Sequence, residues 1–163
     1  MDELDTSPFW AIFTALRARW APPVRTTVDP TVGQPAAQKQ RRILVVDDEE
    51  SVRDFAARAL IGGGYEVALA ADGPEALEIT ERQGPFDLCV IDLRMPAMNG
   101  DELARLLRRA EPDVKILYFT GYSDGLFRDS VSLSATEAFL EKPAGIDGLL
   151  EAVSLLLFGR IRR

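Results

Sequence analysis

Short apolar runs alternate with amphipathic segments from residue 42 onward. Five runs have the length and composition of strands, and they cover residues 43–47, 65–70, 88–92, 115–120 and 138–141. The segments between and after them carry apolar residues at helical spacing, which predicts four helices and a weaker fifth one within residues 123–132. Strands and helices that alternate in this way predict a parallel sheet with helices on both of its faces.

The second strand differs from the others in its polarity. Its apolar residues Tyr65, Val67 and Leu69 alternate with Glu66 and Ala68, whereas residues 43–46 and 88–91 are apolar throughout. A half-polar strand suits the edge of a sheet, and apolar strands suit its centre. Together with right-handed crossovers, this places the strands in the order 2-1-3-4-5. The sequence therefore predicts an α/β domain over residues 42–160, a flavodoxin-like (βα)5 doubly wound parallel sheet.

Capping residues mark where several of these helices begin and end. Three consecutive glycines, residues 62–64, are expected to end the first helix. Asp72 with Glu75, and Asn99 with Glu102, have the spacing of capping boxes at the starts of the second and third helices. In the last helix, the residues expected to face the core are Ile146, Leu149, Leu150, Val153 and Leu157.

Residues 1–41 form an extension of different composition. Ser7-Pro8 has the form of a helix start, and an apolar stripe over residues 8–20 predicts a short amphipathic helix. The following residues are rich in Pro, Ala, Thr and Gln, which predicts a flexible or extended linker. Three roles stay open for the helix: packing back on the domain or remaining free, docking on a partner protein, or binding a membrane surface.

Charge and composition narrow the possible functions of the 163 residues. Residues 1–42 carry six basic and four acidic side chains, and residues 43–163 carry thirteen basic and twenty-two acidic ones, so the net charges are +2 and −9. An acidic domain disfavours nucleic acid as a direct partner. No segment is apolar over the roughly 20 residues that a transmembrane helix needs. The single Cys89 cannot form an internal disulfide, which favours a cytoplasmic protein, and the absence of histidine excludes phosphohistidine and imidazole metal ligands.

Acidic side chains gather at the carboxyl ends of the predicted central strands. Asp47-Asp48 ends the first strand and Asp92 ends the third, at the edge where open α/β sheets bind their ligands. Two carboxylates about 5 Å apart repel by roughly 3 kcal/mol at an effective dielectric constant near 20, so a cation is needed to balance the cluster. Oxygen ligands without His or thiolate favour Mg²⁺, which leaves coordination positions open for a phosphate oxygen.

Two more strand ends complete a site for phosphoryl transfer. Asp92 is the natural nucleophile, because a carboxylate can attack phosphorus to form an acyl phosphate. The Lys142 ammonium and the Thr120 hydroxyl follow the fifth and fourth strands, where they can stabilise charge on the phosphoryl oxygens.

Residues 42–160 resemble the receiver domain of two-component response regulators. The matching segments are Asp47-Asp48, residues 92–100 (DLRMPAMNG), residues 119–124 (FTGYSD) and Lys142-Pro143. Each segment is a weak signal alone, but their order at the ends of four strands is specific. The resemblance implies that Asp92 accepts a phosphoryl group from a histidine kinase or a histidine phosphotransfer protein.

The resemblance also implies a metal site. It assigns Mg²⁺ to the carboxylates of Asp48 and Asp92 and to the main-chain carbonyl of Arg94, with Asp47 acting through water. The peptide bond between Lys142 and Pro143 is expected to be cis.

A switch is the further implication of the resemblance. Phosphorylation draws Thr120 toward the phosphoryl group, and Phe139, expected to be a core residue, fills the vacated space. Partner proteins then read the face of the fourth helix, the fifth strand and the fifth helix. Because only 21 residues follow Lys142, no DNA-binding output domain is expected, and the protein is expected to be a phosphoacceptor rather than an enzyme.

Plainer interpretations stay open beside this one. Asp47 and Asp48 can simply cap the first helix, and Lys142 can be a solvated lysine at a strand end. Two other functions also stay open: a carboxylate-nucleophile phosphohydrolase, and an adaptor whose acidic pocket has no phosphorylation role. The segment 119–124 also resembles receivers fused to hybrid kinases, so the stand-alone context is itself an expectation.

Overall fold

The computed structural model describes residues 40–121 and 136–159. The predicted N-terminal helix over residues 8–20, its linker up to residue 39 and the weaker helix within residues 123–132 lie outside the described residues. In chain order, the described elements are β1 (Arg42–Val46), α2 (Glu50–Gly62), β2 (Glu66–Ala70), α3 (Gly73–Gln83), β3 (Leu88–Ile91), α4 (Gly100–Ala110), β4 (Lys115–Thr120), β5 (Glu137–Glu141) and α6 (Ile146–Phe158).

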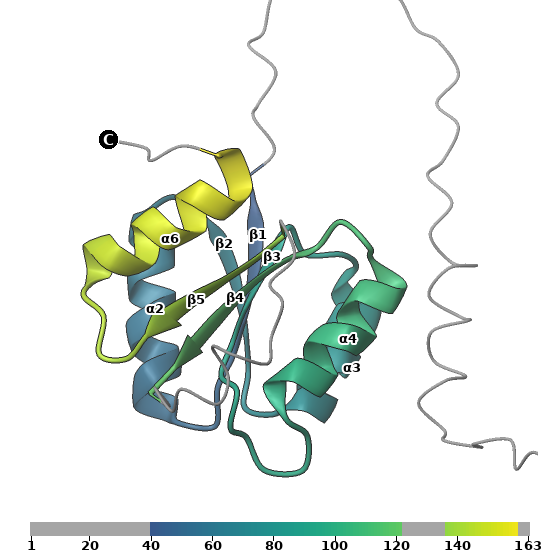
Figure 1. The fold of residues 1–163 in the computed structure, drawn as a ribbon. Coiled ribbons are helices and arrows are strands. Elements are labelled where there is room, and N and C mark those ends of the chain that lie inside the picture. The colour runs from purple at the N-terminus through teal and green to yellow at the C-terminus, as the bar shows by residue number, and fades with distance from the viewer. Residues whose placement is uncertain (1–39, 122–135, 160–163) are drawn as a thin grey trace, which may run out of the picture. The chain divides into compact units, whose positions relative to one another are not determined.

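The five described strands form one parallel sheet in the order β2-β1-β3-β4-β5. The predicted fold class and strand order are therefore confirmed. β2 lies at one edge and exposes part of its length to solvent, while every residue of β3 is buried. Helices α2 and α6 cover one face of the sheet, and α3 and α4 cover the other (Figure 1). None of the described helices is long and apolar enough to span a bilayer.

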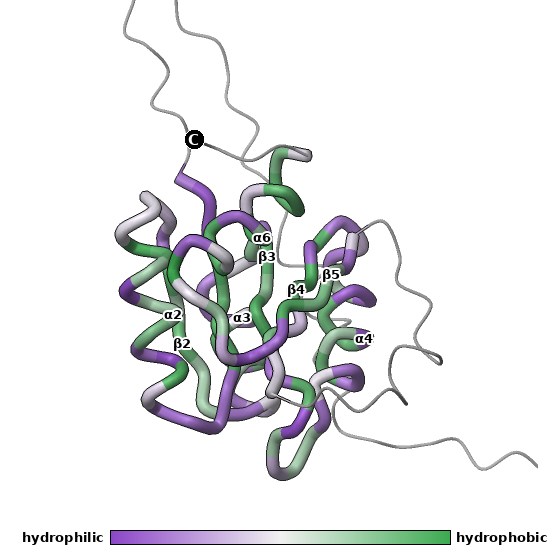
Figure 2. The backbone as a smooth tube through the Cα atoms, turned by 60° about the vertical axis from the view of Figure 1, so that its left-hand side comes forward, coloured by the Kyte–Doolittle hydropathy of each residue, from purple (hydrophilic) through white to green (hydrophobic). Residues whose placement is uncertain are grey.

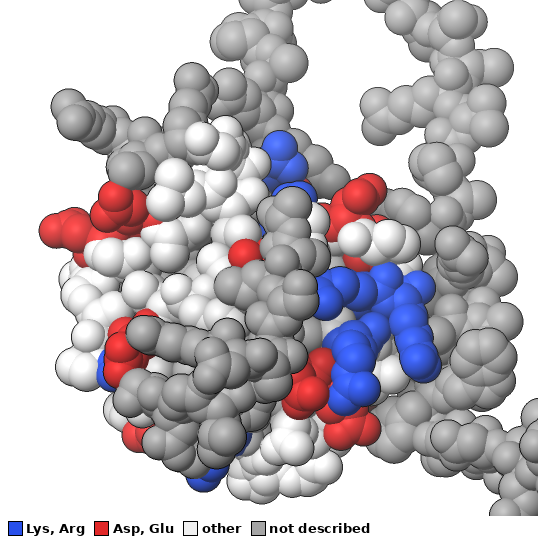
Figure 3. Space-filling view, in the orientation of Figure 1, with Lys and Arg blue, Asp and Glu red and all other residues white. Residues whose placement is uncertain are grey.

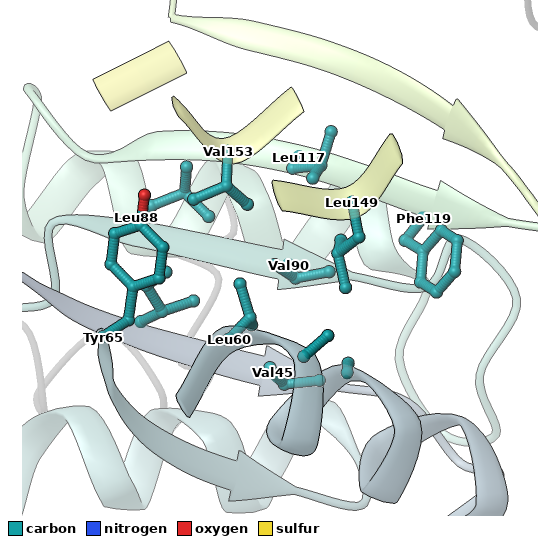
Figure 4. Close-up of a cluster of buried hydrophobic side chains, with 12 residues drawn as sticks. Val45, Leu60, Tyr65, Leu88, Val90, Leu117, Phe119, Leu149 and Val153 are labelled. Atoms are coloured by element: carbon teal, nitrogen blue, oxygen red, sulfur yellow. The ribbon is translucent and has the colours of Figure 1, made fainter. Parts of the chain in front are cut away.

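The main core lies between the sheet and the pair α2 and α6. Leu60 of α2 and Leu149 of α6 are fully buried against Val90 of the central strand β3 (Figure 4). Each apolar side chain of this size stabilises the fold by about 1.5–3 kcal/mol when it is removed from water. Along the tube in Figure 2, apolar residues follow the central strands, and polar residues recur along the helices. This packing holds β1, β3 and β4 in place. Their carboxyl ends form the edge of the sheet where Asp47 and Asp92 lie, called the acidic edge below.

Asp72 caps α3 as predicted, but the return bond of the capping box goes to the residue before the N-cap. At α3, the Asp72 carboxylate accepts a hydrogen bond from the Glu75 N–H at 2.8 Å, and the Glu75 carboxylate accepts one from the Ala71 N–H at 2.7 Å. At α4, the Asn99 side chain makes no capping hydrogen bond, so that prediction is wrong. The main-chain angles differ at the two caps, with φ −157° and ψ 176° at Asp72 but φ −72° and ψ 151° at Asn99, so the two side chains leave the main chain in different directions.

The core-facing stripe of α6 is shorter than the sequence predicts. Leu149 and Val153 are buried, and Leu150 and Leu157 are partly buried. Ile146 is 53% exposed, so its predicted core position is wrong. Ile146 is the first residue of the helix, and Cα–Cβ bonds tilt toward the helix N-terminus, so its side chain points beyond the packed stripe.

A cluster of contacts ties the start of β1 to its surroundings at the amino edge of the sheet. Arg41 pairs with Asp87 at 2.5 Å and lies over the Phe158 ring near the end of α6, 5.9 Å from its centroid. Arg42 donates to the main-chain carbonyls of Gln83 and Pro85 at 3.0 and 3.1 Å. The compact domain therefore includes residues just before β1.

Candidate functional site

Asp47 and Asp92 lie side by side at the carboxyl edge of the sheet. The structure ends β1 at Val46 and β3 at Ile91, one residue earlier than the sequence predicts, so both acids directly follow neighbouring strands. The Asp92 N–H donates to the Val46 carbonyl at 2.9 Å, which continues the ladder between the two strands. Their side chains are almost completely buried. The sheet itself therefore brings these two carboxylates together.

Lys142 joins the two acids from the opposite side of the site. Its ammonium nitrogen lies 2.6 Å from Asp47 Oδ2 and 3.2 Å from Asp92 Oδ1. The Lys142 N–H donates to the Thr120 carbonyl at 2.9 Å, which continues the pairing of β5 with β4. The peptide bond between Lys142 and Pro143 is cis, as predicted. The plainer interpretation of Lys142 as a solvated lysine is therefore wrong.

Main-chain N–H groups hold the other oxygen of each acid. The Glu49 N–H donates to Asp47 Oδ1 at 3.0 Å, and the Arg94 N–H donates to Asp92 Oδ2 at 3.0 Å. Each donor lies two residues after its acid, which is the local turn that aspartate side chains favour. Both carboxylates are thus oriented by their own loops as well as by Lys142.

Burial and charge oppose each other in this site. Burial raises the pKa of Asp47, and the hydrogen bonds from Lys142 and from the Glu49 N–H only partly offset this effect. Burial acts to lower the pKa of Lys142, but its hydrogen bond to Asp47 and the charges of Asp47 and Asp92 outweigh burial and raise that pKa. Lys142 therefore stays protonated at neutral pH, as an electrostatic partner for anions must.

Gly100 allows the loop after β3 to fold back on the site, a role that the sequence pattern does not predict. A Cβ atom at this position would lie 2.1 Å from the Asp92 carbonyl oxygen, a distance that no side chain can accept. The glycine therefore permits α4 to begin directly beneath the main chain of Asp92. The signal in the sequence was a glycine eight residues after Asp92, at the start of a predicted helix.

Asp48 differs from the other acids at this edge. Its residue is exposed, and within the described part of the chain its carboxylate makes no hydrogen bond or ion pair. The described residues also hold no group of three acids close enough to bind a metal ion by themselves. The structure thus joins Asp47, Asp92 and Lys142, and leaves the neighbouring Asp48 as an exposed carboxylate.

The two residues predicted to form the switch lie on adjacent strands. Thr120 ends β4 and is buried. Phe139 of β5 is 37% exposed, so the expectation that it is a core residue is wrong. Its ring stacks on that of Tyr118, the paired residue of β4, with 4.9 Å between centroids. Tyr118 is buried, but β5 is the edge strand of the described sheet, so the Phe139 ring packs on Tyr118 at one side and is partly open to solvent.

The donor set fits Mg²⁺ better than a softer metal. The groups at this edge are carboxylates and main-chain carbonyls, and the chain contains no histidine. Its one cysteine, Cys89, is buried within β3. Mg²⁺ commonly uses one or two protein carboxylates and keeps several waters, so it does not need three preassembled acids. Asp48, Asp92 and the Arg94 carbonyl are the residues that would hold it.

Comparison with known proteins identifies the family of this fold and site. The sequence matches the family described as the response regulator receiver domain over residues 43–154. The chain therefore belongs to the receiver domain family of two-component signalling. Receiver domains bind Mg²⁺ and are phosphorylated by histidine kinases.

The curated relatives that match this chain include a sensor kinase and a response regulator, both longer than the matched region. The chain is 40% identical over 116 residues to the sensor kinase CckA of Brucella abortus, which covers 71% of this chain and 12% of the kinase. It is also 40% identical over 122 residues to the response regulator MprA of Mycobacterium leprae, which covers 71% of this chain and 50% of MprA. The chain thus spans half or less of these two proteins.

Solved structures agree with the same assignment. The response regulator TrrA of Thermotoga maritima, solved in complex with Mg²⁺ and BeF, is 38% identical. The match has a TM-score of 0.64 and covers 72% of this chain and all of that one. The receiver domain of the hybrid histidine kinase CckA is 39% identical with a TM-score of 0.60, and the match covers 71% of this chain and 98% of that one.

Proposed function

We propose that this protein is a phosphorylation-dependent signalling receiver in which Asp92 accepts a phosphoryl group from a phosphohistidine. The observation that carries the proposal is the Lys142 ammonium, which lies 2.6 Å from Asp47 and 3.2 Å from Asp92. A cation held at this point is placed to attract a dianionic phosphoryl group toward Asp92. The donor is a histidine kinase or a histidine phosphotransfer protein.

The transfer is a displacement at phosphorus. An oxygen of Asp92 attacks, a new O–P bond forms as the N–P bond of the phosphohistidine breaks, and the leaving imidazole nitrogen takes up a proton. Lys142 then shifts its contact from the carboxylates to a phosphoryl oxygen. Thr120 supplies a hydroxyl donor from the end of the neighbouring strand.

Mg²⁺ is the cofactor of the proposed reaction. Asp48, Asp92 and the Arg94 carbonyl would hold it, with Asp47 acting through water. When bound, the ion supplies positive charge that balances the acids and the phosphoryl oxygens. The exposed carboxylate of Asp48 supports this assignment, since no Lys or Arg side chain among the described residues forms an ion pair with it.

Output is proposed to run through protein contact at the face formed by β5, α6 and the helix predicted within residues 123–132. Phe139 stands partly exposed on this face, and α6 presents an apolar surface that includes Leu155 at 46% exposure. In Figure 3, acidic side chains lie over the first part of α6, and the rest of its surface is white. Movement of Thr120 toward the phosphoryl group would open space for the Phe139 ring and thereby change this face.

The proposed partners and location follow from the same chemistry. The protein works as a phosphoacceptor that is modified once, rather than as a turnover enzyme. Its partners are proteins rather than nucleic acid, because residues 43–163 carry a net charge of −9. A cytoplasmic location is consistent with the buried free thiol of Cys89.

Phosphorylation by a small phosphodonor tests the proposal. Incubation of the protein with acetyl phosphate and Mg²⁺ is expected to add one phosphoryl group per chain, measured by intact-mass spectrometry. Asp92→Asn is expected to abolish the added mass, because the amide is not a nucleophile for phosphorus. Omission of Mg²⁺ is expected to have a similar effect in the wild-type protein.

The same samples distinguish the competing functions. Continuous release of inorganic phosphate from many phosphate esters, without labelling of Asp92, would identify a phosphohydrolase. If neither acetyl phosphate nor beryllofluoride with Mg²⁺ changed the protein, the phosphorylation-independent adaptor would replace the proposal. Labelling that persists in Asp92→Asn at the wild-type rate would move the acceptor to another residue.

A further inference from the structure

Arg53 lies beside the site but was not identified from the sequence. It belongs to the first turn of α2, where its N–H donates to the Glu49 carbonyl at 3.1 Å. Its guanidinium Nη1 donates to the main-chain carbonyl of Asp47 at 2.5 Å, and its residue is half-buried. Within the described part of the chain, Arg53 forms no ion pair with a carboxylate. An ordinary surface salt bridge therefore does not explain its position.

The bonded carbonyl belongs to the peptide group that joins Asp47 to Asp48. A peptide group is planar and includes the Cα atom of the next residue, so fixing its carbonyl oxygen also restrains the direction of the Asp48 N–Cα bond within that plane. The Asp48 side chain makes no hydrogen bond to described residues that could orient it. The contact with Arg53 is thus a side-chain interaction that restrains the main chain from which the Asp48 carboxylate extends.

Four hydrogen bonds hold Asp47, and Arg53 donates one of them. Its N–H donates to Ala70 of β2 at 3.2 Å, and its carboxylate accepts from the Glu49 N–H and from the Lys142 ammonium. These three contacts position the Asp47 nitrogen and carboxylate but not its carbonyl. Loss of the Arg53 contact would therefore release the Asp47 carbonyl, while Asp47 itself stayed in place and the Glu49 N–H alone restrained the turn through Asp48.

We infer that Arg53 is a positioning residue for the proposed Mg²⁺ site, acting through the Asp47 carbonyl on the Asp48 carboxylate. The inference rests on the proposed function, because that function assigns the metal to this edge of the sheet. Groups that orient a metal ligand usually contribute tenfold or more to metal affinity, even though they never touch the ion.

Charge alone would have the opposite effect, which makes the inference easy to test. Removal of a positive side chain near an acidic cluster strengthens cation binding by Coulomb's law. Removal of a group that orients a ligand weakens it. The sign of the change in Mg²⁺ affinity therefore separates a positioning role from a purely electrostatic one.

Isothermal titration with Mg²⁺ alone, in the absence of any phosphodonor, measures this sign. Arg53→Met is expected to raise the Mg²⁺ dissociation constant about tenfold. Arg53→Lys, which keeps a charged donor, is expected to recover part of that loss. The matched control is Arg58→Met, since Arg58 lies on the same helix with an 81% exposed side chain that pairs with Asp54 at 3.7 Å. This control is expected to bind Mg²⁺ as the wild-type protein does, or slightly more tightly.

The outcomes are distinct. If Arg53→Met and Arg53→Lys bind Mg²⁺ as tightly as Arg58→Met, Arg53 has no positioning role and the inference is overturned, while the proposed function stands. If the wild-type protein itself binds no Mg²⁺, both the proposed function and the inference are overturned. Thermal unfolding of each variant shows whether it is folded, and if Arg53→Met does not fold, the comparison of Arg53→Lys with Arg58→Met decides the question.

Discussion

At the scale of single residues, the acidic edge combines local and distant contacts. Each of the two buried acids accepts an N–H from the residue two positions later, a contact that any aspartate at a strand end can form. The contact with Lys142 is different, because it joins residues 95 positions apart for Asp47 and 50 for Asp92. The local contacts orient each acid separately, and the contact with Lys142 joins the two acids in one cluster.

Cys89 offers a probe of the same region, because it lies in β3 three residues before Asp92. Burial raises the pKa of its thiol to about 12 from an ordinary value of 9.0. We expect iodoacetamide to label the native protein at pH 8 at least about a thousandfold more slowly than the unfolded chain, because the thiolate is the reactive form. Mass spectrometry measures the rate, with protein in guanidinium chloride as the reference. Rapid native labelling would show that β3 opens readily.

At the scale of elements, the starts of α3 and α4 show how reliably a sequence pattern predicts a capping hydrogen bond. The pattern at Asp72 and the pattern at Asn99 have the same spacing, but only Asp72 makes the capping hydrogen bond. The main-chain angles at the two residues differ, so their side chains leave the chain in different directions. A capping pattern cannot reveal these angles, because they depend on how the preceding loop folds.

Substitution of the two capping residues tests this difference. Asp72→Ala is expected to lower the free energy of unfolding by about 1 kcal/mol, the usual cost of a lost N-cap. Asn99→Ala is expected to cost only a few tenths of a kcal/mol, because its side chain makes no capping bond. Urea denaturation followed by circular dichroism measures both values. Equal losses would mean that Asn99 caps α4 in solution.

At the scale of the whole molecule, the sequence predicts the sheet better than it predicts the details of the site. The strand order depends on apolar runs and on the polarity of β2, which the sequence shows directly. The meeting of Asp47, Asp92 and Lys142 follows from that order, because parallel strands end at a common edge. The exposure of Phe139 and the contact of Arg53 could not be predicted, since they depend on side-chain packing between elements. The predicted core position of Ile146 is wrong for a related reason, because periodicity does not show where the buried stripe of a helix ends.

The domain boundary is a prediction for the molecule as a whole. The sequence places it at residue 42, but Gln40 donates to the Gly64 carbonyl at 3.0 Å, and Arg41 pairs with Asp87. A chain of residues 40–163 is expected to fold alone. A chain of residues 42–163 is expected to be less stable by roughly 1 kcal/mol, because partly exposed contacts of this kind contribute little each. Chemical denaturation of the two fragments measures the difference, and failure of the longer one to fold would refute the boundary.

The contact between Arg41 and Phe158 has one more consequence. It brings the entry of the chain into β1 close to the exit from α6, at the end of the sheet opposite the acids (Figure 1). A module whose two ends meet can be spliced into a loop of a host protein without pulling its fold apart. Fusion partners added at either end would also leave the edge that holds Asp47 and Asp92 unobstructed. Such an arrangement suits a unit that recurs as a small part of longer polypeptides.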